Sequence, residues 1–182
     1  VLAADVGGTH TRLARIAVEK NGQRIRHLKV YLSQDYGSLL EVVKLFLSQE
    51  GGSFRSACFG VAGPVRSGRA RGTNLPWNVD AGELADGLGF PCVVVNDLVA
   101  AAWSIPALPP DSVAVLQPGR PDPAGNGAII APGTGLGLAG LFWDGTDLLP
   151  FPSEGGHTEF APANDQEQRI LNALAARFGH VS

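Results

Sequence analysis

The sequence lacks an excess of positive charge, a long apolar run and a secretory signal peptide, and each of these absences excludes a class of protein. Its net charge is −3 at pH 7, whereas nucleic-acid-binding surfaces are strongly basic. No apolar run reaches the roughly 20 residues that a membrane-spanning helix needs. We therefore expect a cytoplasmic protein that binds a small molecule, with no nucleic acid and no membrane as partners.

Cysteine is also scarce, since the chain has only Cys58 and Cys92, and their spacing does not suit a metal site. Both lie in apolar, strand-like segments, which predicts two buried, reduced thiols. The 182 residues are enough to bury a hydrophobic core in one or two domains. Glycine is the residue in excess, with 24 copies that gather in short motifs.

Turn residues and apolar periodicity divide the chain into strands and helices. The first part is predicted to contain strands over residues 1–6, 9–18, 25–32, 54–62 and 93–97. A first helix, with Ser38 and Glu41 at capping-box spacing, is predicted to have Leu39, Val42, Val43 and Phe46 inward. A second helix begun by Asp80 has Leu84 and Leu88 inward, and a third from Leu98 stops at Pro106. The second part is predicted to contain strands over residues 113–116, 128–131 and 136–143 and a helix with Ile170, Leu171, Leu174 and Phe178 inward. The Pro- and Gly-rich segment 106–127 predicts a domain boundary near Ala107.

Residues 93–97, V-V-V-N-D, read as a buried parallel strand that ends in an amide and a carboxylate. In open α/β sheets, ligands bind at the carboxyl ends of the strands, so Asp97 is a candidate catalytic residue. The alternative is that Asp97 or Asn96 only caps the helix that follows. This stretch alone leaves both interpretations open.

The first glycine turn follows the first strand, where Asp5 precedes Gly7, Gly8 and Thr9. Glycine has no Cβ, so backbone N–H groups at such a turn can approach phosphate oxygens. Thr9 can add a hydroxyl donor, and Asp5 can hold a hydrated Mg²⁺. An ordinary tight turn is the alternative. The turn is not a Walker A loop, because no G-K-[ST] follows.

A second glycine turn with Gly133, Thr134 and Gly135 repeats the pattern of buried strand, Gly/Thr turn and apolar return strand. Two such hairpins suggest two related halves that each offer backbone donors to phosphates, although a duplicated structural turn would look the same. Farther on, Glu154 and His157 flank two glycines. Their side chains could hydrogen-bond the vicinal hydroxyls of a sugar, and a surface loop without a role is the alternative.

Four motifs carry a family resemblance: A-D-V-G-G-T-H-T-R-L-A, V-N-D-L-V-A-A, A-P-G-T-G-L-G-L-A and E-G-G-H-T-E-F-A-P, in this order. Together they resemble the bacterial glucokinases of the sugar kinase/Hsp70/actin superfamily, over essentially the whole chain. The related repressor–kinase sugar group usually carries a zinc-binding cysteine cluster that is absent from this sequence.

The resemblance implies an α/β fold of the RNase H-like (actin-like ATPase) type, a mixed β-sheet flanked by helices in each of two lobes with the active cleft between them. Residues 1–107 would form the small N-terminal lobe, and residues 108–182 the beginning of the larger C-terminal lobe. The family's chains are considerably longer. We therefore expect an N-terminal fragment with an incomplete second lobe and with little or no kinase activity by itself.

The resemblance also implies an activity, the ATP-dependent phosphorylation of glucose to glucose 6-phosphate, with ATP and Mg²⁺ required and a homodimer at full length. Asp97 would be the catalytic base, and Asn96, Asp97, Glu154 and His157 would bind the sugar. The nucleotide would contact Ala4, Asp5, Val6, Gly7, Gly8, Thr9, Gly133, Thr134 and Gly135, with Asp5 holding the metal through water. A sugar-sensing regulator on the same fold is the alternative.

Overall fold

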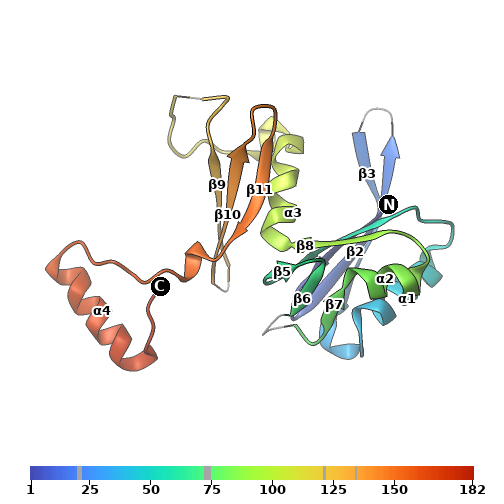
Figure 1. Cartoon of the computed structure of the whole chain (residues 1–182), viewed down its shortest axis with the longest axis horizontal. Coiled ribbons are helices and arrows are strands. Elements are labelled where there is room, and N and C mark those ends of the chain that lie inside the picture. Colours follow the sequence, from blue (N-terminus) through green and yellow to red (C-terminus); the bar gives the residue numbers. More distant parts are fainter. Residues whose placement is uncertain (20–21, 72–74, 121, 134) are drawn as a thin grey trace. The chain divides into compact units, whose positions relative to one another are not determined.

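A computed structural model of the chain describes residues 1–19, 22–71, 75–120, 122–133 and 135–182. They form two compact units, Val1–Ala114 and Val115–Ser182 (Figure 1). The lobe boundary near Ala107 remains a prediction, because compactness alone does not define a lobe. None of the described helices is long and apolar enough to cross a membrane.

The first unit is a mixed α/β structure. Its elements are β1 (Leu2–Val6), β2 (His10–Glu19), β3 (Gly22–Leu32), α1 (Leu39–Glu50), β4 (Ala57–Val61), β5 (Val65–Arg66), β6 (Arg69–Arg71), β7 (Asn78–Asp80), α2 (Ala81–Leu88), β8 (Cys92–Asn96) and α3 (Asp97–Ser104), with 3₁₀ turns at Ser33–Asp35, Ile105–Ala107 and Pro110–Ser112. Within the described residues, five strands form one sheet in the order β3-β2-β1-β4-β8, and β5, β6 and β7 form a smaller sheet.

The large sheet aligns the carboxyl ends of three parallel strands. β1 pairs in parallel with β4, and β4 with β8, whereas β2 and β3 add antiparallel strands on the other side. The register places Asp5 beside Gly60, and Gly60 beside Val95. The strands that end in the first glycine turn and in Asn96 are therefore separated only by β4.

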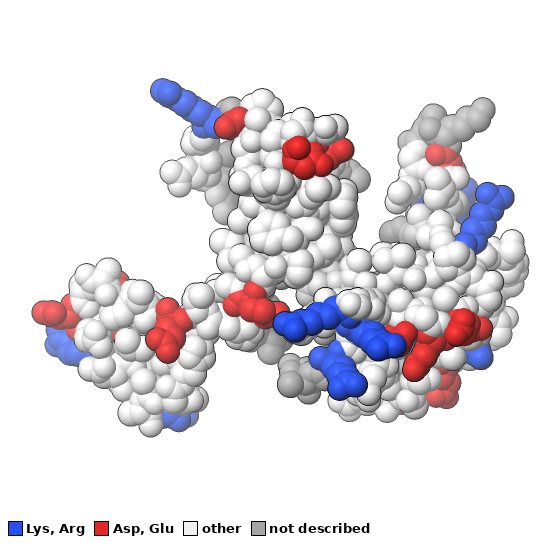
Figure 2. Space-filling view, viewed as in Figure 1, with Lys and Arg blue, Asp and Glu red and all other residues white. Residues whose placement is uncertain are grey.

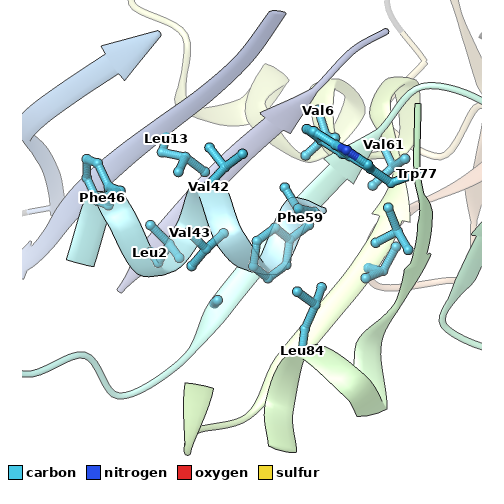
Figure 3. Packing of buried hydrophobic residues seen from close by; sticks show 14 of the residues in the cluster. Leu2, Val6, Leu13, Val42, Val43, Phe46, Phe59, Val61, Trp77 and Leu84 are labelled. Carbon is cyan, nitrogen blue, oxygen red and sulfur yellow. The ribbon is translucent and has the colours of Figure 1, made fainter. Parts of the chain in front are cut away.

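Helices α1 and α2 cover one face of this sheet (Figure 3). The buried core between these helices and the sheet includes Leu2, Val6, Leu13, Phe59, Val61 and Val94 from the strands and Leu39, Val42, Val43, Phe46 and Leu84 from the helices. Helix α1 begins where Ser38 Oγ accepts a hydrogen bond from the N–H of Glu41, at 3.1 Å, which is the predicted cap. The predicted inner faces of both helices are confirmed for these residues.

The second unit contains a three-stranded antiparallel sheet within its described residues. Its elements are β9 (Gly127–Pro132), β10 (Leu136–Trp143), β11 (Leu148–Ser153), the 3₁₀ turn η4 (Gly155–His157) and α4 (Asp165–Phe178). Strand β10 has the predicted bounds, and it pairs with both β9 and β11. The ring of Phe151 occupies the space over Gly140 where a Cβ would otherwise lie.

Four predictions about single elements are wrong. Residues 113–116 form no strand. Val93 is 54% exposed and Cys58 is exposed as well, because these two paired residues lie on the face of the sheet opposite to α1 and α2. None of the described side chains of α4 is buried, so its apolar face is not an inner face in this structure.

Candidate active site

Asp97 lies where β8 meets α3. The cap of α3 is Asn96, whose Oδ1 accepts hydrogen bonds from the N–H groups of Leu98 at 3.0 Å and Val99 at 3.2 Å. Asp97 is the first residue of the helix, and its Oδ1 accepts from the N–H of Leu98 at 2.9 Å and from the Asn96 amide at 3.0 Å. The helix therefore has its cap without Asp97, although these two bonds fix the orientation of the Asp97 carboxylate.

The carboxylate of Asp97 is more basic than that of an ordinary aspartate. Partial burial raises the pKa of Asp97, and the negative charge of Asp5 raises it further, while the hydrogen bonds from Leu98 and Asn96 oppose the shift. A general base works best when its pKa is near the operating pH. The surroundings of Asp97 therefore favour a role as a proton acceptor.

Gly60 provides the space that brings α3 against the sheet. A Cβ built on Gly60 would lie 3.1 Å from the Cβ of Ala100 and 3.7 Å from the Cα of Asp97. A larger residue on β4 would therefore push the start of α3 away from the sheet. Sequence reasoning missed Gly60, although a glycine inside a buried strand can indicate such a close approach.

Asp5 faces Arg12 across the β1–β2 pair, and the two side chains form an ion pair of 2.8 Å. Both are about half exposed, with 57% for Asp5 and 51% for Arg12. No cluster of three or more metal-ligating side chains exists among the described residues. An accessible single carboxylate suits Mg²⁺, which in kinase sites is held by one or two carboxylates together with water and phosphate oxygens.

The first glycine turn is closed by the N–H of Gly7, which donates to the carbonyl oxygen of His10 at 3.0 Å. Thr9 is exposed, whereas Val6 has its side chain in the core. Val6 could therefore contact a nucleotide only through its backbone, and Ala4 is half-buried in the same strand. The hydroxyl of Ser33 donates to the carbonyl oxygen of Gly7, a contact across 26 residues that no local pattern indicates.

In the second unit, the second glycine turn lies directly against η4. Gly133 donates its N–H to the carbonyl oxygen of Gly135 at 2.8 Å, whereas Thr134 lies outside the described residues. A Cβ built on Gly156 would lie 1.7 Å from the carbonyl oxygen of Leu136, the residue after this turn. The unsubstituted glycine thus lets two predicted ligand-binding segments pack together.

Glu154 immediately precedes η4 and His157 ends it, so the two residues flank a 3₁₀ turn rather than an irregular loop. The N–H of His157 donates to the carbonyl oxygen of Glu154 at 2.9 Å, and their side chains approach to 3.8 Å. These side chains are 64% and 74% exposed, so both are accessible to a ligand.

The predicted site residues fall into two groups, one in each unit. The first unit brings together Asp97, Asn96, Asp5 and the first glycine turn, and the second brings together the second glycine turn, Glu154 and His157. Charged side chains of both signs are scattered over the face shown in Figure 2, among many uncharged ones. That distribution agrees with the small net charge of −3.

Comparison with known proteins matches residues 2–182 to the family model described as Glucokinase. The glucokinase of Saccharophagus degradans is 36% identical over 184 aligned residues, which cover the whole chain and 57% of the relative. The glucokinase of Xanthomonas euvesicatoria pv. vesicatoria is 38% identical over 189, with 56% of its length covered. The crystal structure of a glucokinase from an Antarctic psychrotroph matches the whole chain and 58% of its own, at 33% identity and a TM-score of 0.79.

These likenesses confirm the predicted RNase H-like (actin-like ATPase) α/β fold. The chain spans a little over half the length of the curated relatives that it matches.

Proposed function

We propose, on the premise that this chain belongs to the glucokinase family, that the full-length protein carrying it transfers the terminal phosphoryl group of ATP to glucose and yields glucose 6-phosphate. The observation that carries the proposal is the Asp97 carboxylate. It has a fixed orientation and a raised pKa, and it lies at the aligned strand ends beside the first glycine turn. We also propose that this enzyme is a cytoplasmic homodimer.

Asp97 is the general base in this proposal. It accepts the proton of the sugar 6-hydroxyl while that oxygen bonds to the terminal phosphorus of ATP and the bond from that phosphorus to the leaving ADP oxygen breaks. General base catalysis typically contributes about 10²–10⁴-fold to a rate. The hydrogen bonds from Asn96 and Leu98 hold the carboxylate in one orientation for this transfer.

The two glycine turns bind the phosphates of the nucleotide. Residues 4–9 supply the first set of phosphate contacts, with the N–H groups of Gly8 and Thr9 as backbone donors, and Gly133, Thr134 and Gly135 supply the second set. Asp5 would hold Mg²⁺ through water, with its carboxylate shared with Arg12, its ion-pair partner at 2.8 Å. When bound, Mg²⁺ offsets the negative charge on the transferring phosphate.

The sugar is bound by Asn96, Asp97, Glu154 and His157. Both amide hydrogens of Asn96 already have acceptors, since they go to the carbonyl oxygen of Gly63 and to Asp97, each at 3.0 Å. Asn96 can therefore donate to a sugar hydroxyl only if one of these bonds is exchanged. Because Asp97 must stay oriented, we expect the bond to Gly63 to be the one that is replaced.

A coupled assay of the full-length protein with glucose, mannose and fructose tests the proposal. We expect glucose to be phosphorylated with ATP as the donor. Parallel reactions with polyphosphate in place of ATP test the alternative donor. The 182-residue chain assayed alone should show little or no activity. No phosphorylation of any of the three hexoses by the full-length protein would reject the proposed function, and strong activity of the short chain would reject the expectation for it.

A further inference from the structure

Two buried hydroxyl groups lie beneath the first glycine turn. Thr11 on β2 and Ser33, just after β3, are the two polar residues with no exposed surface among those described. Their hydroxyl oxygens lie 3.0 Å apart. Burying a hydroxyl group costs free energy unless the group is hydrogen-bonded. The hydrogen-bond partners of these two hydroxyls therefore indicate their structural role.

The hydrogen bonds of this pair run in one direction. The single hydroxyl hydrogen of Ser33 goes to the carbonyl oxygen of Gly7, at 2.7 Å. Because Ser33 has no second hydrogen to give, Thr11 must be the donor in the contact between the two hydroxyls. The hydrogen bonds therefore form a series from Thr11 through Ser33 to Gly7, and hydrogen bonds in such a series polarise and strengthen one another.

The backbone of Ser33 holds the same turn at a second point, since its N–H donates to the carbonyl oxygen of Thr9 at 2.9 Å. Two carbonyl groups of the turn are thus directed toward Ser33. In a trans peptide the N–H points opposite to the carbonyl, and the described chain contains no cis peptide. The N–H of Gly8, which shares its peptide with the Gly7 carbonyl, is therefore turned away from Ser33.

The N–H groups of Gly8 and Thr9 have no acceptor among the described residues. Successive free N–H groups in a turn are the donors that bind phosphate oxygens. We infer that Ser33 and Thr11 are positioning residues for the nucleotide phosphates, because they fix the orientation of the Gly7–Gly8 peptide that presents the N–H of Gly8. This inference rests on the proposed function of the turn, and it assigns a role to two residues that are not among the predicted nucleotide contacts.

Calorimetric titration of the full-length protein with ATP, ADP, adenosine and glucose tests the inference. Ser33→Ala breaks the hydrogen-bond chain, and we expect it to weaken ATP and ADP binding on the order of 10-fold. Adenosine and glucose do not use the turn, so their affinities should stay at the wild-type value. A merely structural role of Ser33 would instead lower the melting temperature and leave the ratio of ATP to adenosine affinity unchanged.

Thr11 provides a matched pair of variants in case Ser33→Ala does not fold. Thr11→Val keeps the shape and removes the donor, whereas Thr11→Ser keeps the hydroxyl. We expect Thr11→Val to weaken ATP binding and Thr11→Ser to restore it. Equal affinities in the two variants, or equal weakening of all four ligands, would overturn the inference. If the wild type phosphorylates glucose and the variants bind ATP normally, the inference fails and the proposed function stands. If the wild type binds no ATP, both the inference and the proposed function fail.

Discussion

At the scale of single residues, Asp97 makes opposite contributions to stability and to chemistry. Burial, together with the charge of Asp5, raises its pKa in the folded protein, so folding favours the protonated form. Below about pH 3.9 the carboxyl is protonated in both the folded and the unfolded chain, and it costs no stability. As the pH rises through the window between that value and the raised pKa of the folded state, the wild type loses stability.

Asp97→Asn should therefore be more stable than the wild type above this window, because the amide cannot ionise and its oxygen can still accept from Leu98. Melting temperatures of the chain between pH 4 and pH 8 measure the effect. We expect the advantage of the variant to shrink as the pH falls toward 4. A wild type that melts at or above the temperature of Asp97→Asn at pH 7 would contradict this prediction.

The same residue should matter far more for turnover than for sugar affinity. In the full-length protein, we expect Asp97→Ala to lower kcat by about 10²–10⁴-fold, the usual contribution of a general base. The KM for glucose should change much less, because Asn96, Glu154 and His157 remain as proposed sugar contacts. Steady-state kinetics with varied glucose measure both constants, and a variant that keeps near-normal kcat would exclude Asp97 as the base.

At the scale of elements, the contact between η4 and the second glycine turn depends on one missing side chain. A Cβ at Gly156 would lie 1.7 Å from a backbone oxygen, so Gly156→Ala must move one segment away from the other. We expect a loss of about 3 kcal/mol of stability, the upper end of the usual cost of overpacking. Gly135→Ala is the control for folding, since a Cβ there meets nothing within 4 Å.

Chemical denaturation with near-UV circular dichroism compares the two glycine variants, because Trp143 on β10 reports on this sheet. The prediction fails if Gly156→Ala and Gly135→Ala unfold at the same denaturant concentration. Gly135→Ala also has a use in the full-length protein. If its backbone approaches phosphate as proposed, ATP binding should weaken in a variant whose fold is intact.

Sequence patterns predicted elements best where the signals were local. The cap at Ser38, the inner face of α1 and the bounds of β10 depend on residues within a few positions of one another, and all were predicted. The small strand β7 was not predicted, because a strand of three residues is too short to show a periodicity. Strand β8 contains three successive valines, so no alternation of polar and apolar residues indicated which side of the strand faces the core.

At the scale of the whole molecule, long-range contacts determine what local patterns cannot. The glycine turn, Asp97 and the Glu154/His157 turn were predicted as site residues from their motifs. Ser33, Gly60 and Arg12 were not, because their contacts join distant segments or neighbouring strands. The direction that Val93 and Cys58 face depends on which side of the sheet the helices cover. These are properties of the assembled sheet, and no single stretch of sequence contains them.

The helices α1 and α4 should differ sharply in stability, because packing against distant segments stabilises only α1. Helix α1, with 12 residues, buries Leu39, Val42, Val43 and Phe46, whereas α4, with 14 residues, has no buried side chain among those described. Isolated helices of this length are marginal in water, so α1 depends on packing that α4 lacks. Hydrogen exchange of the chain, followed by mass spectrometry, should show slow exchange in α1 and fast exchange in α4.

The variant Phe46→Ala tests whether packing protects α1. It is expected to lower the free energy of unfolding by about 3–5 kcal/mol, and it should accelerate exchange in α1 and leave exchange in α4 unchanged. Protection of α4 equal to that of α1 would show that its apolar face is covered in solution.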